Sequence, residues 1–559
     1  MQRTGKKRHN TKPKKQRDGS VKSLTPKNKI PLHIWAALIA TLILAGFLNT
    51  GALDWGQTGY VSWSPDSIEG RITAIYLPFL FKKWTHKYPR GQYLVSSIFY
   101  KPKIDQWKKN PIAVKMANGK TGYTPFNQKR FYELATISRV ITVFMSLGIL
   151  VAVFLTGRKL FDDNAAGILS ALCLTLSCHF MFYSQSACVD IPAFFWFAWA
   201  GCFGLYAIKS NNLFFYLLAG FCTSWSVCTK ESVATFHVGL ALALAVLLIQ
   251  TKMKEGAGFG KSMLSLLNWK VMAAVALAVL VFVTLEGMWV GLDEWHHRSQ
   301  FWTGVVQKEF LSKGRRFSTL INITYIGLFE GWGRPLLILL ALSLVYWIIR
   351  YRWQLCLTVV PFLGFFFLTV CVIGQNLPRF MMCGYAGIAI LMGKTLADWY
   401  RFKRIPLVVR HILPLLVLVP SFICCVCFNL EMNRDTRVRA EEYMKTFAKS
   451  QATVGLSTSR GGSPRVWLDG FRTIPMWSSE GVMTQQGMIK IRPDYIISSD
   501  QWFSVRSPDK SFYFDRLHKG KTEYEEQARF DRLISLRTGI FGNTASDSSS
   551  CIRESVPTY

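Results

Sequence analysis

Long apolar runs separated by polar connections dominate the chain. Runs of 17 or more residues with few charges recur along its 559 residues. Because a helix needs roughly 20 apolar residues to cross the hydrocarbon core of a bilayer, these runs predict about eleven membrane spans. The expected spans are 33–52, 139–157, 166–184, 191–208, 213–229, 233–250, 271–291, 335–349, 354–373, 381–397 and 411–430. The fold class expected is therefore a polytopic α-helical membrane protein.

The longest connection between two predicted spans covers residues 53–138. It contains two apolar segments, at 72–81 and 93–100, that are too short to cross a bilayer. The first is followed by Lys-Lys-Trp at 82–84, residue types that suit the headgroup region. We expect both segments to form helices that lie in the membrane interface.

The chain after the last predicted span is mostly polar. Its pattern predicts a helix at 436–447 and strands at 453–456 and 495–497, which together indicate a small soluble α/β domain. We therefore expect three parts in the chain: a basic tail (1–32), a membrane domain (33–430) and a C-terminal domain (431–559).

Positive charge is distributed unevenly and predicts the topology. The formal net charge is +33, and residues 1–30 hold eleven Lys or Arg against one Asp, a net of +10. The short connections alternate between rich and poor in Lys and Arg, which indicates a cytoplasmic N-terminus in an inner membrane. Residues 53–138 and 431–559 would then face the periplasm or cell exterior. We interpret the tail as a cytoplasmic retention signal that contacts anionic lipids, not as a nucleic-acid-binding segment.

Cysteine and histidine spacing gives little support for a metal centre. Most of the 13 cysteines lie within apolar runs, where they are typical of small core residues. The adjacent His296 and His297 lack the i, i+4 spacing of a helical zinc site, and a solvated loop explains them better. They remain candidates for substrate contact. No cofactor is indicated, and metal dependence stays open.

The stretch Gly59–Gly70, GYVSWSPDSIEG, carries carboxylates soon after the first span. Asp66 and Glu69 are three residues apart, so on a helix they would share one face. Ser64 and Pro65 before Asp66 also form a good helix-start signal. Two interpretations are therefore open, namely a helix cap at an interface and a catalytic carboxylate.

Two further ionisable residues lie at predicted outer ends of spans. Asp190 begins the fourth span, where a helix N-cap with Pro192 at an early helical position is one explanation. Lys230 follows the fifth span and precedes Glu231, so an ordinary interfacial ion pair is the simplest explanation there. Because Asp66 and Asp190 are predicted on the same side of the membrane, they meet the first requirement of a shared site.

Arg379 and Glu286 are candidates of the same kind. Arg379 precedes a late span; an arginine there either snorkels to the interface or grips a phosphate with its planar fork. Glu286 lies near the outer end of the seventh span. An ionisable group at that depth is a functional candidate unless a buried partner explains it.

The order of several short motifs resembles a known family. The motifs are PDSIE in the first outer loop, Tyr88-Pro89 in HKYPRGQYL, VDIP opening the fourth span, GFCTSWSVCTKES closing the fifth, and LPRF before a late span. Together they resemble the GT-C glycosyltransferases over roughly residues 33–430. The similarity is greatest to bacterial members of the dolichyl-phosphate-mannose protein mannosyltransferase family, which includes the aminoarabinose transferases of lipid A.

The resemblance implies roles for individual residues. It implies a polyprenyl-phosphate-linked sugar as donor and Asp66 as catalytic base, with Glu69 displaced from the family's adjacent Asp-Glu pair. Asp190 matches the second acidic position, and Lys230 and Arg379 match basic positions near the donor phosphate. Tyr88, Glu286, His296 and His297 are further candidates for substrate contact.

These observations predict a membrane glycosyltransferase that acts on the outer face of the membrane, with inversion at the sugar carbon. The acceptor would be a hydroxyl of a lipid, glycan or protein. An oligosaccharide ligase or polymerase, and a transporter or flippase of lipid-linked sugars, are the alternatives. A transporter would place charges at mid-membrane between broken helices, whereas the acidic residues here lie mostly at one face.

Overall fold

The computed structural model describes residues 30–57, 88–115, 121–289, 291–293, 295–297, 300, 317–350, 354–371, 378–449, 451–456, 464–466, 471–475, 493–499, 524–530 and 550–555. Asp66, Glu69 and the first predicted interfacial segment, 72–81, lie outside these residues.

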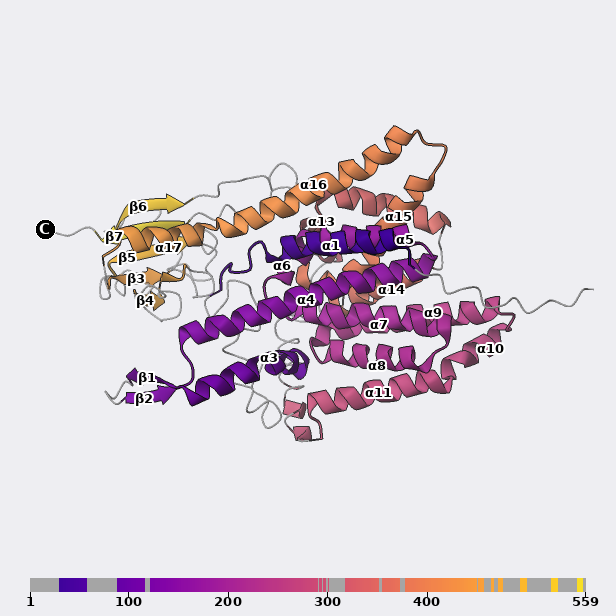
Figure 1. The fold of residues 1–559 in the computed structure, drawn as a ribbon, viewed down its shortest axis with the longest axis horizontal. Coiled ribbons are helices and arrows are strands. Elements are labelled where there is room, and N and C mark those ends of the chain that lie inside the picture. Colours follow the sequence, from indigo (N-terminus) through magenta and orange to yellow (C-terminus); the bar gives the residue numbers. More distant parts are fainter. Residues whose placement is uncertain are drawn as a thin grey trace, which may run out of the picture.

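Long helices form a bundle in which most run roughly along the long axis of the molecule (Figure 1). Helices suit this part of the chain because their backbone hydrogen bonds are satisfied within each segment, as a bilayer requires. They are α1 (Leu32–Thr50), α4 (Gln128–Phe161), α5 (Asn164–Thr175), α6 (Cys178–Ser184), α7 (Asp190–Ser210), α8 (Leu213–Val227), α9 (Ala234–Lys254), α10 (Phe259–Leu264), α11 (Trp269–Glu286), α13 (Phe317–Arg350), α14 (Gln354–Phe365), α15 (Tyr385–Arg401) and α16 (Leu407–Asn433).

The predicted span positions all contain helix. Among the described residues, eight helices are long and apolar enough to cross a membrane, and the bent pair α5–α6 would make a ninth. Two shorter apolar helices, Leu213–Val227 and Cys356–Thr369, occupy two more predicted positions. The polytopic helical fold is confirmed, whereas the number of segments that cross the bilayer stays a prediction.

The bundle has an enclosed centre and a peripheral edge. In α15, 83% of the apolar stretch is buried, and α15 packs so closely on α5 that a Cβ atom at Gly393 would overlap the backbone of Ser170. In α11, none of the apolar stretch is buried. Figure 1 shows α11 along one edge of the bundle. Its exposed side chains are those expected of a helix that faces lipid.

Two helix breaks meet inside the bundle. The α5 and α6 axes differ by 70°, and Ser177 caps α6 through its side chain. The Ser177 hydroxyl also donates a hydrogen bond to the Gly331 carbonyl over 2.9 Å. In α13, Gly333 interrupts the helix with a φ of 68°, a left-handed conformation that glycine adopts readily. The carbonyl released at the α13 break is thus satisfied by the neighbouring break.

An ion-pair network joins the start of α5 to α15. We call Asp163, Lys394, Asp398 and Arg401 the Asp163 cluster. Both Arg401 guanidinium nitrogens contact Asp163 at 2.6 Å, and Lys394 Nζ lies 3.2 Å from Asp163 and 2.5 Å from Asp398. Tyr346 donates to the second oxygen of Asp398 over 3.0 Å. Both carboxylates therefore have partners on each oxygen.

The helix α3 (Arg90–Lys109) follows the first predicted interfacial segment. The prediction of a short helix at 93–100 was wrong in extent, because it relied on the apolar run alone. The helix continues into a lysine-rich part, where Lys101 pairs with Asp105 at 2.8 Å. A hairpin that the sequence did not reveal follows, with β1 (Ile112–Lys115) antiparallel to β2 (Thr121–Thr124).

The C-terminal part contains a helix and a five-stranded sheet. They comprise α17 (Thr436–Phe447), β3 (Thr453–Leu456), β4 (Arg472–Pro475), β5 (Tyr495–Ser499), β6 (Tyr524–Phe530) and β7 (Ser550–Ser555). The strand order is β4-β3-β5-β7-β6, with β3 parallel to β4 and β5, and β7 antiparallel to β5 and β6. Ala440 and Met444 of α17 pack with Val454, Leu456 and Ile497. The predicted helix and both predicted strands are confirmed.

Candidate active site

Asp190 and Lys230 form a buried ion pair. The α7 helix begins at Asp190, but its N-cap is Val189 and no side chain caps it. Lys230 donates to Oδ1 of Asp190, and the two side chains are 8% and 2% exposed. The N-cap interpretation of Asp190 is therefore wrong, and Lys230 pairs with Asp190 where an interfacial pair with Glu231 was the simplest expectation.

The second carboxylate oxygen of Asp190 is buried and unsatisfied, unlike the oxygens of the other buried carboxylates in the described part of the chain. Its Oδ2 atom has no hydrogen-bond partner among the described residues. Leaving a buried acceptor unsatisfied costs about 1–3 kcal/mol, so such atoms need an explanation. An oxygen held ready for a ligand is one explanation.

Arg379 approaches the same ion pair through Phe380. Both residues belong to a short 3-10 segment, Pro378–Gly384, that leads into α15. The Lys230 ammonium lies 4.4 Å from the centroid of the Phe380 ring, and the Arg379 guanidinium carbon lies 5.5 Å from it. Two cations therefore share one aromatic ring, a favourable contact for each. We call Asp190, Lys230, Arg379 and Phe380 the Asp190 cluster.

The start of α3 docks beside this cluster. The Gly91 N–H donates to the Cys228 carbonyl over 2.6 Å, and a Cβ atom at Gly91 would lie 2.7 Å from that oxygen. Only glycine at position 91 allows the backbone to come this close to Cys228, which lies two residues before Lys230. Tyr88 packs against a cluster of Tyr93 and Val189, the residue before Asp190. The Tyr88-Pro89 segment is thus held against the ends of α7 and α8.

Glu286 and Arg90 lie together next to the same turn. Arg90 is buried and donates to the backbone carbonyl of Glu286, and the Glu286 carboxyl lies close to Arg90 and to the thiol of Cys228. A buried partner therefore accounts for Glu286. Sequence reasoning missed Arg90; its signal was an arginine directly after Tyr88-Pro89 and before a glycine.

The two histidines are placed differently. The side chains of His296 and His297 are both exposed, and the His296 ring lies 2.8 Å from the Gln300 amide. No group of three or more His, Cys, Asp or Glu suited to a metal ion occurs within the described part of the chain.

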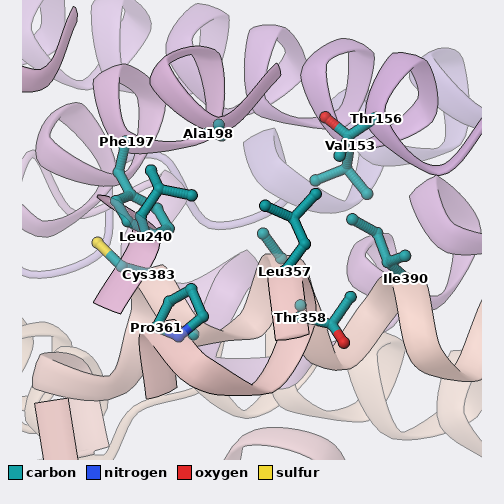
Figure 2. A pocket seen from close by; sticks show the side chains of 14 residues that line it. Val153, Thr156, Phe197, Ala198, Leu240, Leu357, Thr358, Pro361, Cys383 and Ile390 are labelled. Atoms are coloured by element: carbon teal, nitrogen blue, oxygen red, sulfur yellow. The ribbon is translucent and has the colours of Figure 1, made fainter. Parts of the chain in front are cut away.

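An apolar pocket begins at the cluster and continues along the bundle. Cys383 lies close to Asp190 and Lys230, and it also lines a pocket whose other lining residues are mostly apolar. Figure 2 shows Cys383, Phe197 and Leu240 towards one end of the pocket and Val153, Thr156 and Ile390 towards the other. A charged group and an apolar pocket are therefore adjacent.

The arrangement combines fixed positive charge with carboxylates. Lys230 and Arg379 could bind the oxygens of a phosphate, and a planar arginine fork suits such a group. Fixed cations also stabilise negative charge that develops on a leaving group. The predicted residues Asp190, Lys230 and Arg379 thus come together, with Tyr88 and Glu286 beside them.

Residues 79–296 match the family model for dolichyl-phosphate-mannose-protein mannosyltransferase. The resemblance to this family is therefore confirmed for that part of the chain. The matched range includes Asp190, Lys230 and Glu286, whereas Asp66 precedes it and Arg379 follows it.

Several solved structures match the chain at low identity. An apo oligosaccharyltransferase from Archaeoglobus fulgidus is 11% identical with a TM-score of 0.46, and the match covers 89% of this chain and 73% of that chain. ArnT from Cupriavidus metallidurans bound to undecaprenyl phosphate is 11% identical with a TM-score of 0.46, covering 94% and 98%. The A. fulgidus oligosaccharyltransferase AglB in complex with an inhibitory peptide and a dolichol-phosphate is 11% identical with a TM-score of 0.45, covering 84% and 70%.

No curated protein matches the chain by sequence.

Proposed function

We propose that the protein is a membrane glycosyltransferase that moves a sugar from a polyprenyl-phosphate donor to an acceptor hydroxyl. The observation that carries the proposal is the convergence of Asp190, Lys230 and Arg379, which come from separate parts of the chain. The family match over residues 79–296 supports the same reaction class.

In this proposal the Asp190 cluster binds the donor phosphate. Lys230 and Arg379 contact the phosphate oxygens, and Asp190 holds Lys230 in place. The unpartnered oxygen of Asp190 is available to a sugar hydroxyl. The apolar pocket that begins at Cys383 offers the hydrocarbon chain of the donor a place beside the charged group.

The reaction is a single displacement at the anomeric carbon. The acceptor oxygen forms a bond to that carbon, and the bond from the carbon to the phosphate oxygen breaks with its electron pair. Lys230 and Arg379 stabilise the charge that grows on the leaving phosphate. Asp66, which lies outside the described residues, takes the acceptor proton. Attack from the side opposite the phosphate inverts the configuration.

The placement of the charged residues supports transfer over transport. Asp190 is the first residue of α7 and Glu286 is the last residue of α11, so both lie at helix ends and not at mid-span. The bias of Lys and Arg in the short connections supports an active site on the outer face. Tyr88 and Glu286 are proposed to contact the substrate. The exposed His296 and His297 stay outside the proposed site.

Asp66→Asn provides the direct test of the mechanism. Asparagine keeps the size and capping ability of aspartate but accepts a proton far less readily, so turnover should fall by about 10²–10⁴-fold with donor binding retained. The measurement is transfer of sugar from a synthetic polyprenyl-phosphate donor by purified protein in nanodiscs.

Glu69→Gln is the matched control for Asp66→Asn. We expect a smaller effect because Glu69 is displaced from the adjacent pair that the family carries. Near-normal turnover by Asp66→Asn would contradict the base assignment and support the helix-cap interpretation instead.

A further inference from the structure

The chain that leaves α1 is held unusually firmly. We call residues 51–57 the exit segment, because they connect α1 to the loop that carries Asp66, nine residues beyond Gln57. Arg139 of α4 donates to the carbonyls of Leu53 and Trp55, the latter over 2.8 Å. Arg465 donates to the Gln57 carbonyl over 2.9 Å. Three alternate carbonyls of this short segment are thus bound by two arginines.

Arg465 comes from the C-terminal part, between β3 and β4. Its Nε and Nη2 atoms grip the Glu441 carboxylate of α17 at 2.8 and 2.7 Å. The Arg465 and Glu441 side chains are only 16% and 7% exposed. One edge of the guanidinium is therefore fixed by α17, which leaves Nη1 aimed at the exit segment.

A second contact joins the same two parts of the molecule. The Trp55 indole N–H donates to the Asp435 carboxylate over 3.0 Å, and the Arg437 guanidinium carbon lies 5.5 Å from the Trp55 ring centroid. Asp435 is also the N-cap of α17. The first turn of α17 is thus attached to the exit segment.

The exit segment is also tied to the membrane helices near Asp190. The buried Gln57 side chain donates to the Tyr132 carbonyl over 2.7 Å. The Ala52 N–H donates over 2.8 Å to the side chain of Gln185, five residues before Asp190. The exit segment is therefore fixed to α4 and to the chain just before Asp190.

We propose that Arg465 is a positioning residue, through which the C-terminal domain holds the exit segment, the part of the chain that precedes Asp66. This inference rests on the proposed function. Because Arg465 acts through the backbone of Gln57, its loss should impair the geometry of proton transfer and leave the donor-binding cations in place. A misplacement of about 1 Å at a reacting group can cost up to about 100-fold in rate.

The test compares Arg465→Ala with wild type and with Arg472→Ala, an exposed arginine of the same sheet. Two quantities are measured in nanodiscs, namely kcat and KM for a synthetic polyprenyl-phosphate sugar, and hydrogen exchange of amides 51–57. We expect Arg465→Ala to lower kcat by about 10- to 100-fold with KM nearly unchanged, and to speed exchange in the exit segment. Arg472→Ala should behave as wild type.

Arg465→Lys separates positioning from general stability. Lysine keeps the charge but cannot grip Glu441 and the Gln57 carbonyl at once. We therefore expect its kcat to lie between those of wild type and Arg465→Ala, with a smaller loss of melting temperature than Arg465→Ala shows, and this variant carries the test if Arg465→Ala does not fold.

Normal kcat or unchanged exchange in the Arg465 variants would overturn the positioning role. If wild type transfers no sugar, the proposed function fails; faster exchange at 51–57 in Arg465→Ala would then still support the clamp, and unchanged exchange would refute it.

Discussion

The Asp190 cluster and the Asp163 cluster each place an aspartate and a lysine together, at opposite ends of the same bundle. They differ in how many oxygens of the aspartate carboxylate have hydrogen-bond partners. The α7 helix separates them by about 30 Å, at 1.5 Å per residue. Asp163 accepts hydrogen bonds on both oxygens from Arg401, Lys394 and the first N–H groups of α5. Asp190 uses one oxygen for Lys230, and its other oxygen has no hydrogen-bond partner among the described residues.

We propose that the difference separates a structural ion pair from a functional one. Burial alone would raise the pKa of Asp163, but the hydrogen bonds from Arg401 and the charge of Lys394 outweigh it and lower that pKa. Its stabilising effect is therefore present at neutral pH and is lost as the pH falls through the lowered pKa. A saturated cluster has little left to offer a ligand, whereas Asp190 keeps one carboxylate oxygen without a hydrogen-bond partner among the described residues.

The largest effect on stability should come from Asp163→Asn. The change removes the charge that two cations share, and we expect the free energy of unfolding to fall by about 3 kcal/mol. This value is at the low end for a buried pair because Arg401 is 57% exposed and stays hydrated. Thermal unfolding in detergent measures the loss, and kcat per folded molecule should not change. Asp162→Asn, at an 80% exposed neighbour, is the control. A fall in kcat for Asp163→Asn would show that the Asp163 cluster is not purely structural.

Lys230→Gln should show the reverse pattern. We expect kcat/KM to fall by about 100-fold, since a cation facing the leaving phosphate is lost. The fold should survive because glutamine is close to lysine in size and its amide can still donate a hydrogen bond to Asp190. Lys209→Gln, at the other end of α7, serves as control. The functional assignment is refuted if Lys230→Gln lowers the melting temperature and leaves sugar transfer intact.

The smallest effect should come from exchanging arginine for lysine in each cluster. Arg379→Lys keeps the charge but loses the planar fork, so kcat/KM should fall by about 10-fold without a change in melting temperature. Arg401→Lys should cost at most about 1 kcal/mol of stability and leave kcat unchanged. Kinetic and melting measurements on the two variants side by side test this. Equal kinetic effects would show that the clusters do not differ in role.

Local sequence features predicted the elements well. Apolar run length located a helix at every predicted span, because the requirement to cross a hydrocarbon core acts on each segment separately. The helix at 436–447 and the strand at 453–456 were also predicted, since their patterns are contained within a few residues. The extent of α3 was not, because its lysine-rich half carries no apolar run.

The sequence by itself determined the membrane-spanning architecture and a set of ionisable residues at helix ends, because these depend on composition over short windows. The tertiary structure alone decided which of them meet. Lys230 could have paired with its neighbour Glu231, yet it pairs with Asp190, 40 residues earlier in the chain, because the end of α8 packs beside the start of α7. Arg379 joins them only because a 3-10 segment places Phe380 against Lys230. Contacts of this range follow from helix packing, which a periodic pattern does not encode.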